Sequence, residues 1–504
     1  MTTGKWYCEM VAGGTGSCFG IATAAANLIW PGNDANGYGY RGDLGQLMYN
    51  GSATVTGMST FTTNDIIGMA FDADNGKIWF SKNGTWYNSG NPAAGTNATK
   101  TGIAAGTWFV MIGYITTTSA AYFNAGQRAF AYTAPSGYKA LCTQNLPTPT
   151  ILNGANYMAA SLYTGSASTQ SISNAVNGIS FQPDLVWIKD RSSIQDHKLT
   201  DSVRGTTKGL VADSTAAETT DTNGVTAFNS NGFALGTGDR TYSNTNADSY
   251  VAWQWKGGGT GVTNNNGTIA STVSANTTAG FSVVGYTGNG VTSATVGHGL
   301  GVTPSFIITK NRDIGTSAYD WYSNHVSLGA GQMEIDLSLN NVNPATTFSN
   351  GGLAPATSWT NQVFNFVAGT AGNANNVNNN TSKFIAYCFA AITGYSAFGS
   401  YTGNNTTDGP FVYLGFRPRF LMIKSTSNAT DWVMIDTARN TYNLASTSLI
   451  SNSATNEATI GTVNQIDILS NGFKPRNNTG YVNAAQTYIY AAFAENPFTL
   501  SRAR

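Results

Sequence analysis

The stretch FDADNGKIWFSKNGTWYNSG, residues 71–90, contains two Asn-Gly pairs with a short, largely apolar segment between them. An EF-hand calcium loop needs alternating oxygen ligands, a glycine at its sixth position and a glutamate at its twelfth, and this stretch lacks that spacing. Asn-Gly instead suits a type I′ turn, in which both central residues have positive φ. The stretch therefore predicts a strand from Lys77 to Lys82, bracketed by two turns in a three-stranded meander.

The rest of the chain has the same character. Short β-branched and aromatic runs bounded by Gly, Asn and Ser recur from end to end, whereas helical periodicity is hard to find. Runs that we interpret as strands include GKWYCEM from Gly4, TWFVMIGYI from Thr107 and SYVAWQWK from Ser249. The sequence predicts an all-β protein.

The composition limits the number of domains and the class of partner. The chain has 504 residues, so we expect two to four domains. Charged residues make up only 10% of it, and 25 Lys and Arg balance 25 Asp and Glu. Because binding to nucleic acid needs a basic surface that releases counterions, we expect no nucleic-acid partner.

No membrane segment or secretion leader is evident. The chain has no run of about 18 apolar residues, and its first residues, MTTGKWYCEM, lack a charged and then apolar leader. We therefore expect no membrane insertion, and folding in a cytoplasm even if the protein later works outside one.

Cysteines and histidines do not form a cofactor or metal motif. The cysteines show no CxxC pair and are interpreted as small buried apolar side chains, with a contact between the first two across a hairpin as the alternative: Cys8, Cys18, Cys142 and Cys388. The histidines are far apart, lack metal-ligand spacing and are expected in turns or on the surface: His197, His298 and His325. We expect no cofactor and no metal.

Four motifs within the first 140 residues carry a resemblance to a known family. They are GKWY from Gly4, FGIA from Phe19, DIIGMAFDADNGKIWFSKNG from Asp65 and FNAGQRAF from Phe123. In this order they resemble the SPRY domain, particularly the version found in bacteriophage tail and fibre proteins. The resemblance implies a bent β-sandwich over residues 1–140 that binds protein or glycan partners through surface loops, without catalysis.

One departure from the family pattern concerns the sheet edge before Lys5. Family members usually carry more chain before the GKWY strand, whereas only three residues precede it here. We expect either a truncated sandwich or a strand supplied by a neighbouring chain, because an open strand edge is prone to association.

Prolines and repeated motifs divide the remaining chain. The proline-containing stretch at residues 141–154 predicts an extended connector. Beyond it, four motifs recur three times in one order: YTG, a proline-led apolar run, an Asn-Gly or Gly-Gly turn and a closing strand. The YTG motifs are 123 and 115 residues apart and begin at Tyr163, Tyr286 and Tyr401. This pattern predicts tandem jelly-roll-like β-sandwich repeats at residues 155–257, 268–393 and 394–497.

The repeats resemble modules that recur in predicted tail proteins of marine bacteriophages, often behind a phage-type SPRY domain. Together the two resemblances imply a virion structural protein, a tail fibre or similar appendage that folds in the host cytoplasm. Its expected partners are other virion proteins, a host surface glycan or protein, and further copies of itself. Most phage fibres are trimers, and low charge with many apolar residues suits large contacts between chains, so we expect a homotrimer.

A polysaccharide-degrading tailspike is the alternative from a different class, and it would need paired carboxylates about 5 to 10 Å apart. A polar set recurs in the first and third repeats and changes in the second, and its members are, in that order, Asp196, Asp201 and Arg204; Asp431, Asp436 and Arg439; Asp320, His325 and Leu328. A catalytic set would hardly change so much between active units. We therefore interpret it as ion pairs that pin a loop or join two units, and expect no enzyme.

Aromatic residues among turn residues are the candidate binding residues. Tyr, Trp and Arg among Gly, Asn and Ser are typical of binding loops, because rigid amphipathic rings give contact area at low entropic cost and can stack on sugars. The candidates lie in the loop at residues 27–43 and at the end of the second hairpin: Trp30, Tyr38, Tyr40, Arg41, Trp86 and Tyr87. Packing of these rings on the sandwich is the alternative. A capsid or baseplate decoration protein without receptor activity is the remaining functional alternative.

Overall fold

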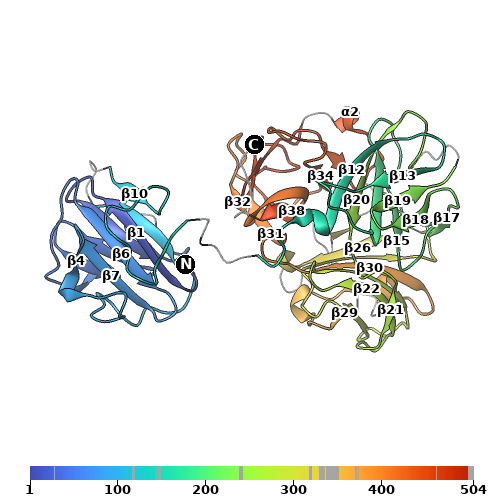
Figure 1. The fold of residues 1–504 in the computed structure, drawn as a ribbon. Coiled ribbons are helices and arrows are strands. Elements are labelled where there is room, and N and C mark those ends of the chain that lie inside the picture. Colours follow the sequence, from blue (N-terminus) through green and yellow to red (C-terminus); the bar gives the residue numbers. More distant parts are fainter. Residues whose placement is uncertain are drawn as a thin grey trace. The chain divides into compact units, whose positions relative to one another are not determined.

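The computed structural model describes residues 1–27, 29–115, 120–142, 145, 149–237, 242–316, 320–328, 335–336, 351–368, 372, 374–460 and 463–497. The chain forms two compact units, Met1–Pro147 and Thr148–Arg504. Nearly all regular structure is strand, which confirms the all-β prediction (Figure 1). Within the described ranges, no helix has the length and apolar character needed to cross a membrane. The described helical turns are α1 (Asn375–Asn378), α2 (Glu457–Ile460), η1 (Tyr87–Ser89), η3 (Gly154–Asn156), η4 (Val326–Leu328) and η5 (Ala356–Ser358).

The first unit packs two sheets against each other around one apolar core. The first sheet contains, in spatial order, β10 (Tyr122–Asn124), β1 (Lys5–Val11), β6 (Ile66–Asp72), β7 (Lys77–Lys82) and β8 (Thr85–Trp86), with β11 (Lys139–Ala140) also against β1. The second sheet contains β5 (Ser52–Val55), β4 (Gln46–Tyr49), β3 (Gly37–Arg41), β2 (Ser17–Ala22) and β9 (Phe109–Tyr114). All pairs are antiparallel except β1 with β11.

The opening stretch forms the meander β6–β7–β8, and β7 has the predicted bounds. Asn83 and Gly84 both have positive φ, 47° and 80°, as the predicted type I′ turn requires. The turn before β7 is different, because only Gly76 has positive φ there. The Asp72 carboxylate closes that loop by accepting hydrogen bonds from the backbone and side-chain amides of Asn75, at 3.1 and 2.9 Å. The prediction of a type I′ turn at Asn75-Gly76 is therefore wrong.

Strand β1 has partners on both sides. β6 pairs with it along residues 5–11, while β10 pairs with residues 9–11 and β11 with residues 6–7. Strands from later in the chain thus occupy the edge that the sequence left open before Lys5. The prediction of an open edge is therefore wrong for β1, whereas the supply of a strand by a neighbouring chain stays a prediction.

The second unit contains three large sheets. The first contains, in spatial order, β12 (Met158–Thr164), β20 (Ser249–Trp255), β14 (Leu185–Asp190), β15 (Lys198–Asp201), β16 (Lys208–Val211) and β17 (Thr219–Thr220). The second contains β21 (Val262–Asn264), β22 (Ser271–Asn276), β23 (Phe281–Thr287), β30 (Lys383–Phe389), β25 (Phe306–Asn311), β26 (Trp321–His325) and β27 (Ile335–Asp336). The third contains β31 (Ser396–Thr402), β38 (Thr487–Pro497), β33 (Phe416–Ser425), β34 (Val433–Asp436) and β35 (Leu449–Ile450).

Three small sheets accompany the large ones. They are β13 (Gln170–Ser173), β19 (Gly232–Leu235) and β18 (Val225–Asn229); β24 (Thr295–Gly297), β29 (Val363–Val367) and β28 (Gly352–Leu353); β32 (Val412–Tyr413), β37 (Gly472–Pro475) and β36 (Ile466–Leu469). We call β12–β20, β23–β30 and β31–β38 the first, second and third segments. Each segment has eight strands when β17 is left out, and we number them from one to eight along the chain. The strands of one segment then lie in the order 1-8-3-4-5 within its large sheet and 2-7-6 within its small sheet. The predicted limits of the repeats stay predictions, and the turn motif of the second one, from Phe348, lies largely outside the described residues.

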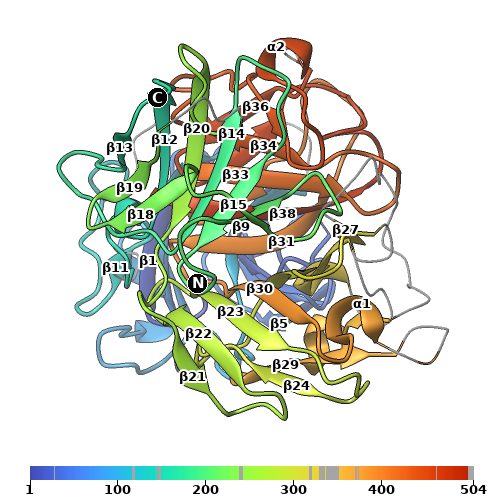
Figure 2. The same ribbon diagram turned by 90° about the vertical axis from the view of Figure 1, so that its right-hand side faces the viewer.

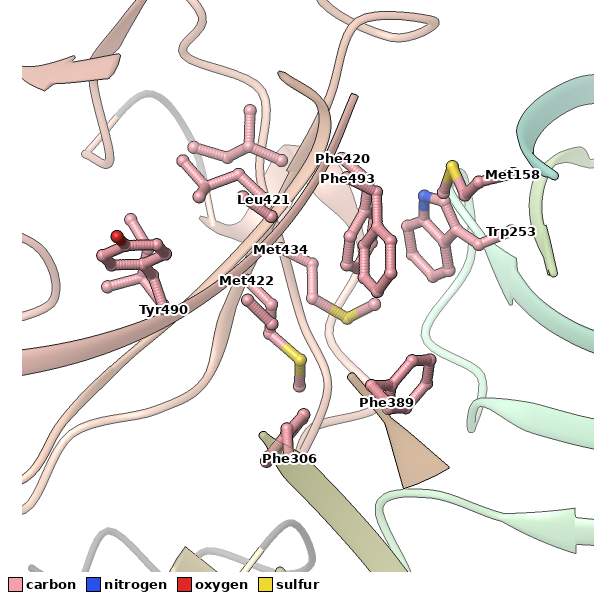
Figure 3. Packing of buried hydrophobic residues seen from close by; sticks show 14 of the residues in the cluster. Met158, Trp253, Phe306, Phe389, Phe420, Leu421, Met422, Met434, Tyr490 and Phe493 are labelled. Atoms are coloured by element: carbon pink, nitrogen blue, oxygen red, sulfur yellow. The ribbon is translucent and has the colours of Figure 1, made fainter. Parts of the chain in front are cut away.

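The central strands of each large sheet, such as β14, β25 and β33, are buried on both faces. One face packs on the small sheet of its own segment, as the cluster of Ile172, Val186 and Phe233 illustrates in the first segment. The other face packs on the large sheets of the other two segments (Figures 2 and 3). Strand β14 therefore has six buried residues in a row, without the alternation of a half-exposed strand. The segments form one unit with a common core and not separate sandwiches on a string.

Aromatic residues from all three segments meet in this common core. Trp255 of β20 lies 6.2, 5.5 and 5.7 Å from Phe389, Phe420 and Phe493, measured between ring centroids. Phe389 and Phe493 occupy the position of Trp255 in their own sheets. Trp255 pairs with Leu185, and at the matching positions Phe389 pairs with Phe306 and Phe493 with Phe420. A small apolar cavity of about 20 Å³ remains at the centre, lined by residues of all three segments.

The cysteines and histidines lie mostly inside the protein. Cys8, Cys18 and Cys388 are buried and unpaired, which confirms that they act as apolar side chains, and the first two belong to different sheets. The three histidines are buried as well: His197, His298 and His325. The prediction of a surface position is therefore wrong for all three. His197 and His298 do lie outside the strands, directly before β15 and directly after β24, whereas His325 ends β26.

Candidate functional site

Two of the predicted binding residues belong to the core of the first unit. Tyr38 and Tyr40 are 8% and 2% exposed, and both point from β3 into the apolar cluster between the sheets. The sequence Tyr-Gly-Tyr alternates along an extended strand, so both rings fall on one face and Gly39 on the other. The prediction that these two rings lie in an exposed loop is wrong, and the period-two pattern was the signal for it.

Two other candidates lie away from any concavity described below. Arg41 forms a two-point ion pair with Asp43, at 2.7 and 2.8 Å. Trp30 is half-buried and lies over β9, where Gly113 makes room for it. A Cβ at Gly113 would approach the Trp30 Cα to 2.4 Å.

Trp86 and Tyr87 are partly exposed and are held from several sides. Trp86 ends the meander, where it pairs with Ser81, and its ring lies edge-on to Tyr7 at 6.3 Å. Tyr87 begins η1, and its hydroxyl donates to the backbone oxygen of Thr56 at 3.1 Å. The tight turn at Asn83 thus brings two adjacent aromatic side chains to the surface on a rigid hairpin.

Two concavities meet at Trp86. One has a volume of about 260 Å³ and is lined by Tyr40, Gly57, Ser59, Phe80, Lys82, Thr85, Trp86, Tyr87 and Asn88. The other has a volume of about 540 Å³ and is lined by Thr85, Trp86, Ser89, Gly90, Asn91, Pro92, Ala93, Thr133 and Pro135. Trp86 and Thr85 line both, so the structure brings three of the six predicted residues, Tyr40, Trp86 and Tyr87, to one candidate site.

The lining is polar and almost uncharged. The charged residue among the lining residues is Lys82, whose ammonium is already held by the Thr60 backbone oxygen at 2.9 Å and the Asp65 carboxylate at 3.0 Å. Hydroxyls, amides and one indole face suit a neutral ligand with many hydroxyls or peptide groups. The prediction missed Lys82 and the loop from Asn88 to Ala93, although the turn-rich sequence after Tyr87 was a signal for a surface loop.

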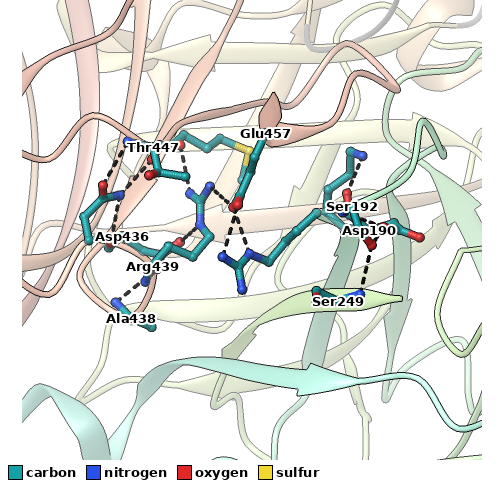
Figure 4. Close-up of polar contacts among 12 residues, drawn as sticks. Asp190, Ser192, Ser249, Asp436, Ala438, Arg439, Thr447 and Glu457 are labelled. Atoms are coloured by element: carbon teal, nitrogen blue, oxygen red, sulfur yellow. Dashed lines mark hydrogen bonds and ion pairs between the residues drawn. The ribbon is translucent and has the colours of Figure 1, made fainter. Parts of the chain in front are cut away.

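The recurring polar set forms a network between segments, and Figure 4 shows its copy in the third segment. The Arg439 Nε donates to the Asp436 Oδ2 at 2.6 Å, and its Nη1 donates to the Glu457 Oε1 at 3.1 Å. Two residues of the first segment complete the network. The Trp253 Nε1 donates to the Asp436 Oδ2 at 3.0 Å, and Arg191 forks onto Glu457 at 2.9 and 3.1 Å.

The first segment repeats this network against the second. The Arg204 Nε lies 2.5 Å from the Asp201 Oδ2, and the Arg204 Nη1 lies 3.3 Å from the Glu218 Oε2. The Tyr387 hydroxyl donates to Asp201 at 2.9 Å, and Arg312 forks onto Glu218 at 2.8 and 3.0 Å. Burial opposes the charge of Arg204, but Asp201 and its other neighbours outweigh this effect and raise the guanidinium pKa.

These contacts confirm the interpretation as ion pairs that join units for Asp201 with Arg204 and for Asp436 with Arg439. The sequence comparison found the Asp and Arg members but missed Glu218 and Glu457, because their partners lie in another segment. Of the remaining predicted members, Asp431 accepts a hydrogen bond from Asn452 at 2.8 Å. Among the described residues, no group of three His, Cys, Asp or Glu side chains is placed to hold a metal ion.

His325 occupies in the second segment the position that Asp201 and Asp436 occupy in the first and third. Each of the three residues pairs with the same position of the neighbouring strand, which is Phe306 for His325, Leu185 for Asp201 and Phe420 for Asp436. Its Nδ1 accepts a hydrogen bond from the Ser327 backbone N–H at 3.1 Å. The neutral ring therefore carries its proton on Nε2, which donates to the backbone oxygen of Tyr490 at 3.2 Å. Burial lowers the pKa of His325 to about 4, although the Tyr490 oxygen opposes this effect.

This histidine predicts an acid-sensitive joint. Between pH 6.5 and 4 the unfolded chain binds a proton at His325 that the folded chain does not, so the second unit loses stability as the pH falls. His325 alone lowers the free energy of unfolding by about 3 kcal/mol between pH 6.5 and pH 4. Chemical denaturation of the His325→Gln variant at several pH values will give a shallower loss on the acid side. His298, whose pKa burial also lowers to about 4, remains in that variant and retains its own share. An unchanged pH profile would contradict the prediction.

Comparisons with known proteins match both units of the chain. Residues 153–497 match a family described as "Domain of unknown function (DUF7483)", and residues 5–99 match the SPRY domain, which confirms that prediction for the N-terminal region. One similar solved structure is the crystal structure of the SPRY domain of human HERC1, with 20% sequence identity and a TM-score of 0.22. The similarity covers 26% of this chain and 79% of that one. No curated protein matches the chain.

Proposed function

The chain belongs to the DUF7483 family through residues 153–497, and from this membership and the SPRY domain at residues 5–99 we propose that it is a non-catalytic attachment protein of a bacteriophage particle. In this proposal the SPRY domain binds the target. The DUF7483 region is the rigid body that carries the SPRY domain.

The pair of concavities that meet at Trp86 carries the proposal. The larger concavity, about 540 Å³, lies in the range of small-molecule sites, and the smaller one, about 260 Å³, lies just below it. The partly exposed Trp86 ring belongs to both. A sugar or peptide that crosses the Trp86 ring contacts both hollows at once. The nearly uncharged lining favours a neutral glycan or peptide segment on a host surface.

The phage setting rests on the resemblance of the sequence motifs to phage tail and fibre proteins. The chain then acts on the virion as a tail fibre or similar appendage, beside other virion proteins. The buried networks of Asp201 and Asp436 favour a structural role over hydrolysis, because their carboxylates are already satisfied by arginines. Part of the apolar surface that suggested a homotrimer is buried between segments of one chain.

Replacing Trp86 with alanine is expected to weaken target binding at least tenfold. The ring lines both concavities, and central aromatic residues of a binding site typically contribute 2 kcal/mol or more. The measurement is binding of the labelled full chain to an array of bacterial surface polysaccharides and to intact bacteria. The matched control is Trp30→Ala, which changes another half-buried tryptophan of the same unit outside both concavities.

Three outcomes would contradict the proposed function. Equal loss of binding in the Trp30 and Trp86 variants would place the site elsewhere. Absence of binding to every polysaccharide and every cell would favour a decoration protein without receptor activity. Release of reducing sugar from a bound polysaccharide, abolished by Asp436→Asn, would favour a tailspike.

A further inference from the structure

Two loops of the first segment reach different neighbours. The loop at residues 191–196, between β14 and β15, contacts the third segment, whose Asn456 side chain donates to the Ser192 backbone oxygen at 2.7 Å. The loop at residues 213–218, between β16 and β17, contacts the second segment, whose Lys310 ammonium donates to the Thr215 backbone oxygen at 3.0 Å. The two-point arginine–glutamate contacts described above involve the same loops. A contact between these two loops therefore couples both joints of the first segment.

One carboxylate from each loop lies where the two loops meet. Asp196 ends the first loop and Asp213 begins the second. Because β15 pairs with β16 and the Ala212 N–H donates to the His197 oxygen at 3.1 Å, Asp196 and Asp213 lie opposite each other at the end of this ladder. The Asp213 Oδ1 accepts a hydrogen bond from the His197 backbone N–H at 2.9 Å. Like charges directly opposite each other on paired strands repel, so two ionised carboxylates are unfavourable here.

The third segment contains the same arrangement with an amide in place of one carboxylate. From the pairing of β34 with β35, Asp431 and Asn452 occupy the positions of Asp196 and Asp213. The Asn452 Oδ1 accepts from the Trp432 backbone N–H at 2.9 Å, and the Asn452 Nδ2 donates to the Asp431 Oδ1 at 2.8 Å. The Asp213 Oδ2 therefore corresponds to the Asn452 Nδ2 and faces Asp196. A hydrogen-bond donor belongs at this position, and an ionised carboxylate has none to offer.

The charged groups around the pair leave room for a proton. Burial, and after it the Asp196 carboxylate, raises the pKa of Asp213 to about 7, although a backbone N–H and the Lys189 ammonium oppose this effect. The Lys189 ammonium, from β14, already donates to two backbone oxygens at 2.7 and 3.2 Å. Lys198 of β15 and Tyr242 also face Asp196, and the Lys198 ammonium donates to a threonine hydroxyl at 3.0 Å. Both ammonium groups thus have other partners, and the Asp213 carboxyl keeps a proton near neutral pH.

We propose that Asp196 and Asp213 share one proton, which fastens the loop that contacts the third segment to the loop that contacts the second. The protonated Asp213 Oδ2 donates to Asp196, as the Asn452 amide donates to Asp431 in the third segment. When the pH rises above neutral the proton leaves to solvent, the two carboxylates repel each other and both loops loosen together. This device goes beyond the proposed binding function and does not depend on it.

The pair and the buried histidines respond to pH with opposite signs. Between about pH 4 and pH 7 the folded chain holds a proton at Asp213 that the unfolded chain has lost, so the stability that this proton contributes falls as the pH rises. At His325 the folded chain lacks a proton that the unfolded chain binds, so stability falls as the pH falls. The two effects together favour mildly acidic to neutral conditions.

The test is hydrogen exchange of the full chain at pH 6 and pH 8, corrected for the intrinsic pH dependence of exchange. In the wild type, protection of residues 191–196 and 213–218 should fall about tenfold, as the protonated fraction of Asp213 does over this range. Asp213→Asn should abolish the fall, because an amide supplies the donor at either pH. Asn452→Asp should introduce the same fall at residues 426–431 and 452–457 of the third segment. The control Asp408→Asn changes a highly exposed carboxylate and should behave as wild type in all four loops.

Each possible outcome decides the proposal. Equal falls in wild type and Asp213→Asn overturn it, because Lys189, whose pKa burial lowers to about 8, titrates in both proteins and would then be the cause. A wild type without a fall overturns it, as does an Asn452→Asp variant that gains none. Protection regained at pH 8 on adding calcium also overturns it, since a cation would then join the carboxylates. If Asp213→Asn fails to fold, Asp196→Asn replaces it, because its amide can donate to Asp213 and should abolish the fall equally.

Discussion

The Asp436→Ala variant should lose about 3–5 kcal/mol in the free energy of unfolding of the second unit. Asp436 is buried and accepts four hydrogen bonds, from Arg439 Nε, Trp253 Nε1 and the backbone N–H groups of Ala438 and Arg439. Without the Asp436 carboxylate, the buried guanidinium of Arg439 is left with the Glu457 carboxylate, which it shares with Arg191. The Trp253 indole N–H loses the hydrogen bond that it donates to Asp436. Removing one member of a buried ion pair leaves an uncompensated charge, which costs this much in comparable proteins.

Two controls separate this effect from a general loss of charge. Asp408→Ala removes a highly exposed carboxylate of the same segment that also contacts basic residues, and it should leave the unfolding transition almost unchanged. The double variant Asp436→Leu with Arg439→Met should recover most of the stability, because apolar residues tolerate burial where a single charge does not. Denaturant titration of the three variants checks both. A single variant as stable as wild type would contradict the prediction.

The Trp255→Ala variant should destabilise all three segments together, by about 3–5 kcal/mol. The Trp255 ring contacts Phe389 of the second segment and Phe420 and Phe493 of the third, in the core that no single segment completes alone. Removing a buried tryptophan loses its transfer free energy and leaves a cavity. Hydrogen exchange should therefore show loss of protection in β20, β30 and β38 alike.

Two further variants make this prediction specific. Trp255→Phe should cost far less, because phenylalanine occupies the matching positions 389 and 493 and because the buried Trp255 N–H has no hydrogen-bond partner among the described residues. Tyr442→Ala, at a position that is 75% exposed, should leave exchange in all three strands unchanged. Loss of protection confined to β20 would show that the segments are independent, contrary to the prediction.

Local features of the first unit could be predicted from sequence, because short-range chemistry decides them. The Asn83-Gly84 pair specifies a type I′ turn through residues that accept positive φ, and the bounds of β7 follow from it. The same reasoning failed at Asn75-Gly76, where the Asp72 carboxylate closes a different turn. An Asn-Gly pair permits a tight hairpin, but a neighbouring side chain can select another loop.

The candidate site was only half predictable. Trp86 and Tyr87 follow a turn signal directly, so their position at the end of a hairpin could be anticipated. Tyr38 and Tyr40 were assigned to a loop because Gly and Asn surround them, although their alternation with Gly39 is that of a strand with one buried face. The loops that complete the concavities come from residues 88–93 and 133–135, and only the folded chain brings those two segments to the same ring.

The sequence by itself determined the all-β class, the Asn83-Gly84 turn with the strand before it, and the threefold recurrence of its motifs, because period-two patterns and turn residues act over a few neighbours. It also marked Asp201 and Asp436 as a matched pair of positions. Only the tertiary structure decided that three large sheets share one core and that each carboxylate network joins two segments. The physical reason is that an apolar face specifies that it must be covered, whereas the surface that covers it is chosen by packing between residues far apart in the chain.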